Sequence, residues 1–196
     1  MVRCMDGMRI TVVACLLLAA CGATLGPEPS ASPSLSAEWS LHEAAGLRIA
    51  TPAAWGAPEV FPAIDPNGPR AWIEFRDPSG AEAVALMTWR DATASALAAA
   101  QYESERPRGD APTELKLSDG TLARTVVAMS GYAHWSDATG AGTYECRSLY
   151  VQLDPRLVAV VIACGAHVKG TATPAPDLLR VQEQVALRLG VAGGAP

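Results

Sequence analysis

The run Val158-Ala159-Val160-Val161-Ile162-Ala163 limits most strongly how this chain can fold. Its β-branched residues favour an extended strand, and it contains no polar residue that would mark a face turned to water. Such a strand is stable only when other elements cover both of its faces. The run therefore predicts a layered fold with this strand between the layers.

The rest of the chain alternates short apolar segments with turn residues, which predicts antiparallel hairpins. Asp77-Pro78-Ser79-Gly80 has the residues of a β-turn, and Asp119-Gly120 favours a tight hairpin turn. Strands are expected over residues 47–49, 71–76, 82–90, 114–117, 121–129, 144–153 and 157–166.

Two segments have the pattern of helices. Residues 92–106 are rich in Ala and follow Asp91, a suitable N-cap. Residues 176–189 carry apolar side chains at helical spacing and precede Gly190, a typical C-cap. The predicted fold class is therefore α+β, with an antiparallel sheet of six or seven strands flanked by helices.

Residues 131–142 are polar and contain glycines, so we interpret them as an exposed loop. Within it, Tyr132, His134 and Trp135 form the candidate surface for a partner or ligand. Tryptophans more often pack in a core than form a ligand platform, but Trp135 has polar surroundings. The stretch from His134 to Asp137 includes the residue types of a hydrolytic triad, yet close neighbours along a chain rarely converge on one reacting atom.

Cys146 and Cys164 are expected to form a disulfide. If residues 154–156 form a hairpin loop, Leu153 lies opposite Leu157, and the two cysteines fall opposite each other seven steps from that closing pair. Alternation then makes theirs a non-hydrogen-bonded pair, whose Cα atoms are about 4.5 Å apart. The alternative is two buried, reduced cysteines. No His-x-His or Cys-x-x-Cys near them indicates a metal site.

The sequence has no recognisable catalytic or cofactor motif. It lacks a Gly-x-Ser-x-Gly elbow, a His-Glu-x-x-His helix, a phosphate-binding loop and a calcium loop. We therefore expect no enzymatic activity, no metal and no cofactor. The chain has 15 Lys and Arg against 20 Asp and Glu, and this net charge of −5 gives no support for nucleic-acid binding.

The N-terminus has the features of an export signal. Residues 10–18 form an apolar run after Arg3 and Arg9, and this run is too short to span a bilayer. Leu18-Ala19-Ala20-Cys21 follows and resembles the lipobox of bacterial lipoproteins. The resemblance implies cleavage before Cys21, diacylation of its thiol and anchoring at the extracytoplasmic face of a bacterial membrane. An ordinary signal peptide with an incidental Cys21 is the alternative.

This interpretation divides the chain into four parts. They are a signal peptide at 1–20, the lipidated cysteine with a Pro/Ser/Gly-rich tether at 21–37, a single domain at 38–191 and a flexible tail at 192–196. Two acyl chains anchor a protein durably, whereas one binds a membrane only marginally. We therefore expect the lipid to hold the protein at the membrane.

The segment Gly46-Leu47-Arg48-Ile49-Ala50-Thr51-Pro52-Ala53-Ala54-Trp55 resembles the opening of PsbP-like domains. In those domains a glycine, an apolar strand, a proline and a tryptophan begin the fold. The order of expected elements is also similar, from about Trp39 to Val191. Bacterial members include small lipoproteins of the LpqN type. The resemblance implies a sandwich of sheet and helices that binds or assembles partners, with no catalytic residues to carry over.

We therefore expect a membrane-anchored, extracytoplasmic lipoprotein that is a binding or assembly module for an envelope protein or a lipid-linked partner. A carrier of a small molecule or lipid, with an apolar pocket between sheet and helix, is one alternative. An envelope hydrolase that uses residues 131–142 is another.

Overall fold

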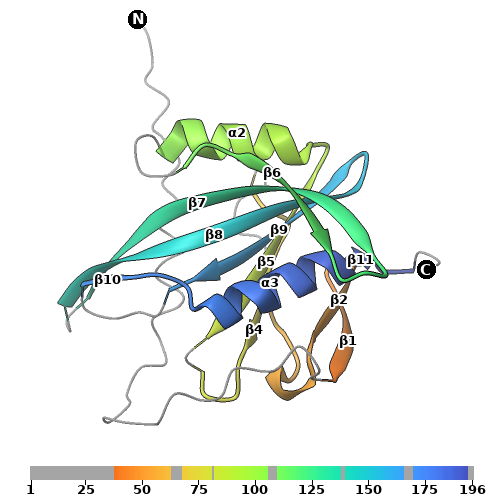
Figure 1. Cartoon of the computed structure of the whole chain (residues 1–196), viewed down its shortest axis with the longest axis horizontal. Coiled ribbons are helices and arrows are strands. Elements are labelled where there is room, and N and C mark those ends of the chain that lie inside the picture. Colours follow the sequence, from red (N-terminus) through yellow and green to blue (C-terminus); the bar gives the residue numbers. More distant parts are fainter. Residues whose placement is uncertain are drawn as a thin grey trace, which may run out of the picture.

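A computed structural model describes residues 38–62, 68–80, 82–105, 110–137, 140–165 and 170–193. Within these ranges the chain forms two β-sheets and two α-helices, an α+β fold in which helices flank an antiparallel sheet (Figure 1). The predicted fold class is confirmed. The predicted signal peptide, Cys21 and the tether lie outside the described residues, as does the end of the predicted tail.

The described strands belong to a large sheet and a small one. In spatial order, the large sheet contains β3 (Glu59–Pro62), β4 (Ala71–Arg76), β5 (Ala83–Arg90), β9 (Leu157–Cys164), β8 (Gly140–Asp154), β7 (Ala123–Asp137) and β6 (Thr113–Ser118), with β10 (Gly170–Ala172) paired to β8 beside this path. The small sheet contains β1 (Trp39–Ala44), β2 (Leu47–Pro52) and β11 (Gly190–Val191). The helices are α2 (Ala94–Glu105) and α3 (Pro176–Arg188), and a short 3-10 turn, η1, spans Ala53–Trp55.

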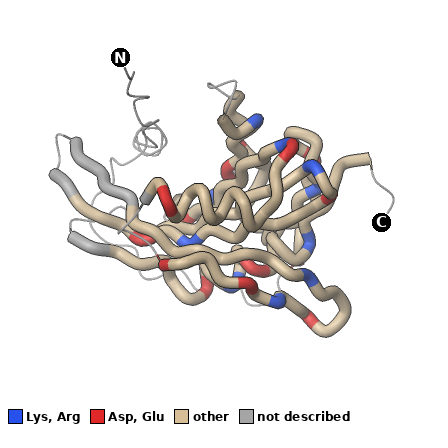
Figure 2. Tube along the Cα trace, turned by 90° about the horizontal axis from the view of Figure 1, so that it is seen from above, with Lys and Arg blue, Asp and Glu red and all other residues tan. Residues whose placement is uncertain are grey.

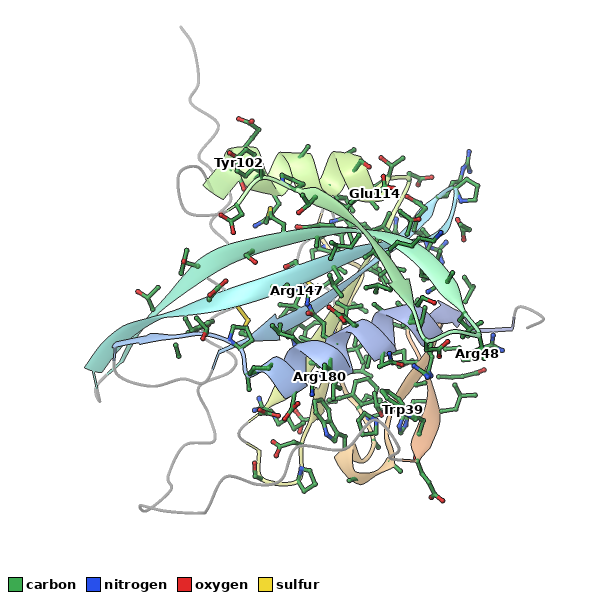
Figure 3. The ribbon with its side chains drawn as sticks, in the orientation of Figure 1. Trp39, Arg48, Tyr102, Glu114, Arg147 and Arg180 are labelled. Atoms are coloured by element: carbon green, nitrogen blue, oxygen red, sulfur yellow. A yellow bond between two sulfur atoms is a disulfide. The ribbon has the colours of Figure 1, made fainter. Side chains whose placement is uncertain are left out.

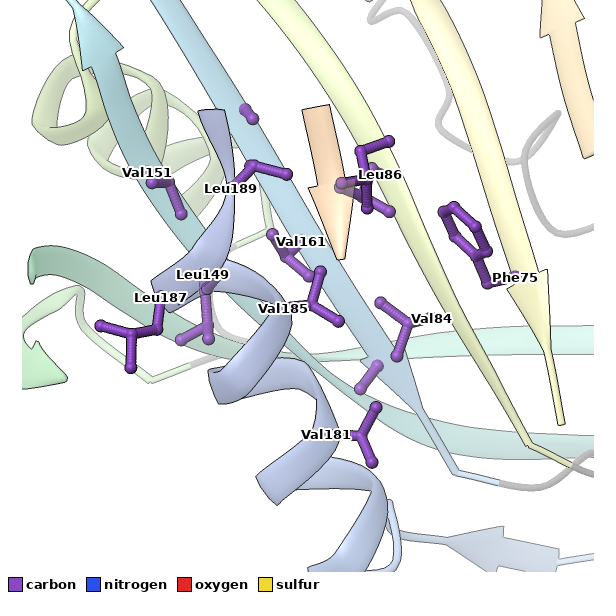
Figure 4. Close-up of a cluster of buried hydrophobic side chains, with 14 of the residues drawn as sticks. Phe75, Val84, Leu86, Leu149, Val151, Val161, Val181, Val185, Leu187 and Leu189 are labelled. Atoms are coloured by element: carbon purple, nitrogen blue, oxygen red, sulfur yellow. The ribbon is translucent and has the colours of Figure 1, made fainter. Parts of the chain in front are cut away.

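The central strand β9 is covered on both faces, as its apolar run predicts. On one face Val161 belongs to the main core together with Val181 and Val185 of α3 (Figure 4). On the other face Val160 belongs to a second cluster together with Ala98 of α2. Because α3 and α2 take opposite faces, every residue of the run is buried except Ile162, which is half-buried.

Both helices lie where the sequence predicts them, but the predicted caps are wrong. Asp91 lies in a turn with φ +57°, and Thr93 accepts the hydrogen bond from the Ala96 N–H at its Oγ1, 3.2 Å away. Gly190 is not a C-cap, because it pairs with Arg48 as part of β11. The physical reason is tertiary: the strand partner decides the conformation of Gly190, and no local pattern shows it.

The small sheet brings the two ends of the described domain together. β11 pairs antiparallel with β2, which follows directly after the first strand of the domain. The guanidinium group of Arg188, at the end of α3, lies 4.9 Å from the ring centre of Trp39, at the start of β1. The first and last described elements therefore hold each other in place.

Asp119 organises the turn between β6 and β7. Its Oδ1 accepts hydrogen bonds from the Leu122 N–H at 2.9 Å and from the N–H and hydroxyl of Thr121 at 3.0 and 2.8 Å. Its Oδ2 lies 2.9 Å from the guanidinium group of Arg188. The bond from Leu122 first, then those from Thr121, and finally the charge of Arg188 lower the pKa of Asp119 from 3.8 to about 2.

An Asp119→Asn variant is expected to be less stable than the wild type at neutral pH. The pKa of Asp119 is lower in the folded chain than in the unfolded chain, so its contribution is complete above pH 3.8 and is lost as the pH falls towards about 2. Urea unfolding of both proteins across this range measures the difference in stability, which we expect to close at the acidic end. A difference of unchanged size at low pH would contradict this role of the carboxylate.

Candidate functional site

Strands β7 and β8 continue past the end of β9 and form an arm, which we define as residues 131–137 of β7 and 140–145 of β8. The pairing of β8 with β9 ends at Cys146 and Cys164, whereas the pairing of β7 with β8 continues along the whole arm. At a rise of about 3.3 Å per residue, the arm reaches roughly 20 Å beyond the last pair of β9. It projects at one end of the molecule (Figure 1).

The predicted exposed loop over residues 131–142 is therefore wrong. These residues extend a hairpin, with Tyr132 opposite Glu145 and Trp135 opposite Gly142. Aromatic residues suit a strand, and pairing satisfies backbone groups that a loop would leave to water. A hairpin that projects from a sheet needs no fully buried face, so its sequence lacks the apolar alternation of the other strands.

The Cys146–Cys164 disulfide is confirmed, and it lies at the base of the arm (Figure 3). The two Cα atoms are 4.0 Å apart and occupy the outermost pair of β8 and β9. Just beyond them, the Gly165 N–H donates a hydrogen bond to the Glu145 carbonyl at 2.9 Å. Hydrogen-bonded and non-hydrogen-bonded pairs alternate along an antiparallel ladder. Because Glu145 and Gly165 form a hydrogen-bonded pair, the neighbouring cysteines form the non-hydrogen-bonded pair that the sequence predicts.

The turn that sets this register differs from the prediction. Asp154, and not Leu153, lies opposite Leu157, and a bulge separates this pair from Gln152 and its partner. The Oδ1 of Asp154 accepts a hydrogen bond from the Arg156 N–H at 2.7 Å, which favours the shorter turn. The extra residue in the bulge compensates for the shorter turn. Beyond the bulge the register is the predicted one, so the predicted closing pair is wrong and the cysteine pairing is right.

Strand β10 supports the arm from one side. Its residues Gly170–Ala172 pair in parallel with Gly142–Tyr144 of β8. The chain leaves β9 at Gly165, which lies against the end of β10. A Cβ atom at Gly165 would lie 2.6 Å from the carbonyl oxygen of Ala172 and 2.9 Å from the carbonyl carbon of Thr173. Only glycine fits between β9 and β10 at this point.

A Gly165→Ala variant is expected to displace β10 and loosen the arm, because the atoms in the way belong to the backbone and cannot rotate aside. Hydrogen exchange should become faster at the Thr143 amide, which is the one of residues 142–144 that points toward β10 and away from β7, with the disulfide still intact. Gly190→Ala is the matched control, since the atoms nearest to a Cβ there belong to the flexible Arg48 side chain, at 3.4 Å and beyond. Equal exchange at Thr143 in both variants would contradict the role of β10.

The edge of β7 that faces away from β8 is open along the arm, as far as the described residues show. β6 pairs with β7 only as far as Ala128, and the Asp110 N–H then donates to the Ser130 carbonyl at 3.0 Å. No described strand pairs with residues 131–137 on this side. Tyr132 is 46% exposed. The base of the arm therefore presents an aromatic side chain beside unpaired backbone.

The structure brings the predicted surface residues together in one strand, since Tyr132, His134 and Trp135 all lie in the part of β7 that forms the arm. The side chains of His134 and Trp135 lie outside the described part of the structure. The element that carries them is therefore a strand and not the predicted loop, and their role as a surface for a partner or ligand stays a prediction.

Of the four buried polar side chains among the described residues, Glu74 and Gln182 make contacts that were not predicted from the sequence. Glu74 on β4 forms an ion pair with Arg76 and accepts a hydrogen bond from the Trp72 Nε1–H at 3.4 Å. Gln182 on α3 is fully buried and donates to backbone carbonyls of β8 and β9 at 2.7 and 2.8 Å. The alternation of apolar and polar residues along β4 places Glu74 on the same face as Trp72 and Arg76, so this group could have been predicted. A glutamine in a helix usually faces water, so Gln182 could not. Both join parts of the scaffold.

The remaining shifted pKa values have local structural causes. Burial, together with the nearby charges of Asp77 and Asp177, raises the pKa of Glu82. Burial lowers the pKa of Arg124, whose guanidinium group donates to the Ala186 carbonyl at 2.9 Å. Among the described residues, no group of three or more His, Cys, Asp and Glu side chains is placed to hold a metal ion. In that same part of the chain, no helix is both long and apolar enough to cross a membrane.

Comparison with known proteins does not assign the chain to a family. No family pattern and no curated protein matches it. A crystal structure of a protein from Bacteroides thetaiotaomicron VPI-5482, at 1.50 Å resolution, is similar with 10% sequence identity and a TM-score of 0.46. The similarity covers 79% of this chain and 48% of that one, so the chain spans about half the length of this solved neighbour.

Proposed function

We propose that this protein is an exported lipoprotein that binds an envelope protein or lipid-linked partner through its arm, without catalysing a reaction. A diacyl group on Cys21 holds it at the extracytoplasmic face of a bacterial membrane. The observation that carries the proposal is the arm itself. It is a long, braced hairpin, none of whose described side chains belongs to the main core, and it has one open edge among the described residues.

The construction of the arm supports a role in recognition. Binding is stronger when the binding element is already ordered, because less conformational entropy is lost on association. The disulfide at the base and the parallel pairing with β10 both order the arm before any partner arrives. A hairpin whose only role was to stabilise the sheet would not need to extend past β9, the strand with which it pairs.

The position of the arm also fits anchoring from the N-terminus. The described chain begins next to Trp39, which lies toward the end of the molecule opposite the tip of the arm (Figures 1 and 3). A tether that enters at this end leaves the arm free to extend away from its point of attachment. The proposed lipid and the proposed binding element therefore do not compete for the same side of the domain.

The resemblance to PsbP-like domains supports the same class of function. Its motif residues have structural roles here, since Gly46 closes the β1–β2 turn at φ +79° and Trp55 is buried in the main core. Members of that family generally act as binding or assembly modules. Membership of the family is part of this proposal.

A photo-crosslinking experiment in cells tests the proposal. A photoreactive amino acid replaces Tyr132 on the arm or, as the control, Leu122 in the β6–β7 turn, which is similarly exposed at 49%. We expect one envelope component to be captured from position 132 and not from 122, and the capture to be lost in a Cys21→Ala chain. Failure to capture any component from position 132, with the protein anchored and folded, would refute the proposal.

A further inference from the structure

The backbone of the arm presents regularly spaced hydrogen-bonding groups at its open edge. In an antiparallel strand the N–H and C=O of one residue point to the same side, and the side alternates from residue to residue. The Ser130 carbonyl points away from β8, because it accepts the hydrogen bond from Asp110. The N–H and C=O groups of Tyr132, His134 and Ser136 therefore also point away from β8.

This edge has none of the features that usually prevent another strand from pairing with it. Natural edge strands are protected by charged side chains, prolines, bulges or short length. Residues 132–136 contain no Lys, Arg, Asp, Glu or Pro. The register of β7 with β8 is continuous over the whole arm, without a bulge. The edge is therefore regular, uncharged and, among the described residues, unpaired.

We infer that the open edge of β7 binds an extended segment of a partner protein as an additional β-strand. This inference rests on the proposed function and specifies its mode of binding. Regularly spaced N–H and C=O groups along an edge are complementary to another extended polypeptide, which offers the same groups at the same spacing. The backbone of the arm thus selects a protein partner over a sugar or a free lipid.

The charge of the chain indicates what kind of segment binds. Acidic and basic residues are both spread over the body of the domain (Figure 2), and the acidic ones are in excess, so that the whole chain carries a net charge of −5. The arm itself ends in Asp137 and carries Glu145 opposite Tyr132. A second copy of this chain carries the same net charge and its own Asp137 and Glu145 on the arm, so like charges oppose the pairing of two arms. The expected occupant is therefore a neutral or Lys/Arg-bearing segment of a different protein.

A pair of variants at His134 separates the backbone from the side chain. His134→Pro removes an outward N–H and none of the hydrogen bonds to β8, so the substitution is tolerated as prolines are on edge strands. His134→Ala removes the side chain and keeps the N–H. Melting temperatures and the intact disulfide mass verify that both variants fold. If His134→Pro loses binding and His134→Ala keeps it, the backbone at the open edge makes the interaction.

The binding probe is an acetylated and amidated peptide of sequence Lys-Thr-Val-Thr-Val-Thr-Lys, with the full chain as receptor. Binding is measured by fluorescence anisotropy, and amide chemical shifts of Tyr132 and Ser136 locate it. We expect His134→Pro to weaken binding by about tenfold, the effect of losing a backbone hydrogen bond at the edge, and His134→Ala to bind like the wild type. A peptide with Glu in place of Lys should bind more weakly, and one N-methylated at both valines should not bind.

Several outcomes would overturn the inference. Equal peptide affinity in the wild type and His134→Pro excludes strand addition at this edge. Sedimentation that shows a wild-type dimer, absent in His134→Pro, identifies a second copy as the occupant and excludes the heterologous segment. If His134→Pro still allows the crosslink from position 132, strand addition fails while the proposed function stands. The absence of that crosslink in the wild type is the result that would refute the proposed function instead.

Discussion

Replacement of Phe75 by Ala is expected to lower the free energy of unfolding by about 3–5 kcal/mol, because a large side chain leaves a cavity that the core cannot fill. Phe75 is completely buried, belongs to the main cluster and lies opposite Val84 and near Leu86 of β5 (Figure 4). Its ring also contacts the ring of His42 on β1, with centres 5.2 Å apart. The substitution therefore weakens both the large sheet and the attachment of the small one.

Chemical denaturation followed by circular dichroism measures this effect, and Phe75→Leu is the matched control. Leucine keeps most of the volume and all of the apolar character, so its cost should stay below about 1.5 kcal/mol. A cost for Phe75→Ala no larger than that of Phe75→Leu would mean that the core around β4 is not packed as described.

Removal of the Cys146–Cys164 disulfide is the second large effect that we expect. The bridge joins residues separated by 18 positions, and closing a loop of this size restricts the unfolded chain by about 3 kcal/mol on the chain-entropy model. For a domain of this size, that loss corresponds to a fall in melting temperature of roughly 6–12 °C. The Cys146→Ser, Cys164→Ser double variant tests it.

The same double variant separates the effect of the bridge from that of the reductant. A strong reductant should lower the melting temperature of the wild type to that of the variant and leave the variant unchanged. Limited proteolysis adds a local measurement, since cleavage within residues 131–145 should accelerate once the base of the arm is released. An identical melting temperature with and without reductant, after mass spectrometry confirms reduction, would show that the bridge does not stabilise this fold.

Elements whose conformation is encoded locally could be predicted from the sequence. The apolar run of β9 requires cover on both faces, and the spacing of apolar residues in α3 indicates which face packs on the sheet. The strands that the sequence did not reveal include β10 and β11, with three and two residues. Such segments are too short to show a hydrophobic pattern. Pairing with β8 and β2 stabilises them as strands.

The candidate site could be predicted only in part for a related reason. The sequence shows aromatic side chains among polar neighbours at Tyr132, His134 and Trp135. The polar neighbours, however, predict a loop. Whether a polar segment extends a hairpin depends on the pairing available to it, and that pairing is decided by register. The cysteines could be paired from register alone, because the bulge near Leu153 happens to restore the predicted count.

The pairing of β11 with β2 has a consequence for the order in which the domain is completed. Chains emerge from the ribosome N-terminus first, so Leu47 and Arg48 are available long before Gly190 and Val191. The Trp39–Arg188 contact likewise waits for the last residues of the domain. Until then one edge of β2 lacks its neighbour and α3 is incomplete. A nascent chain therefore cannot close this fold before its final residues have been made.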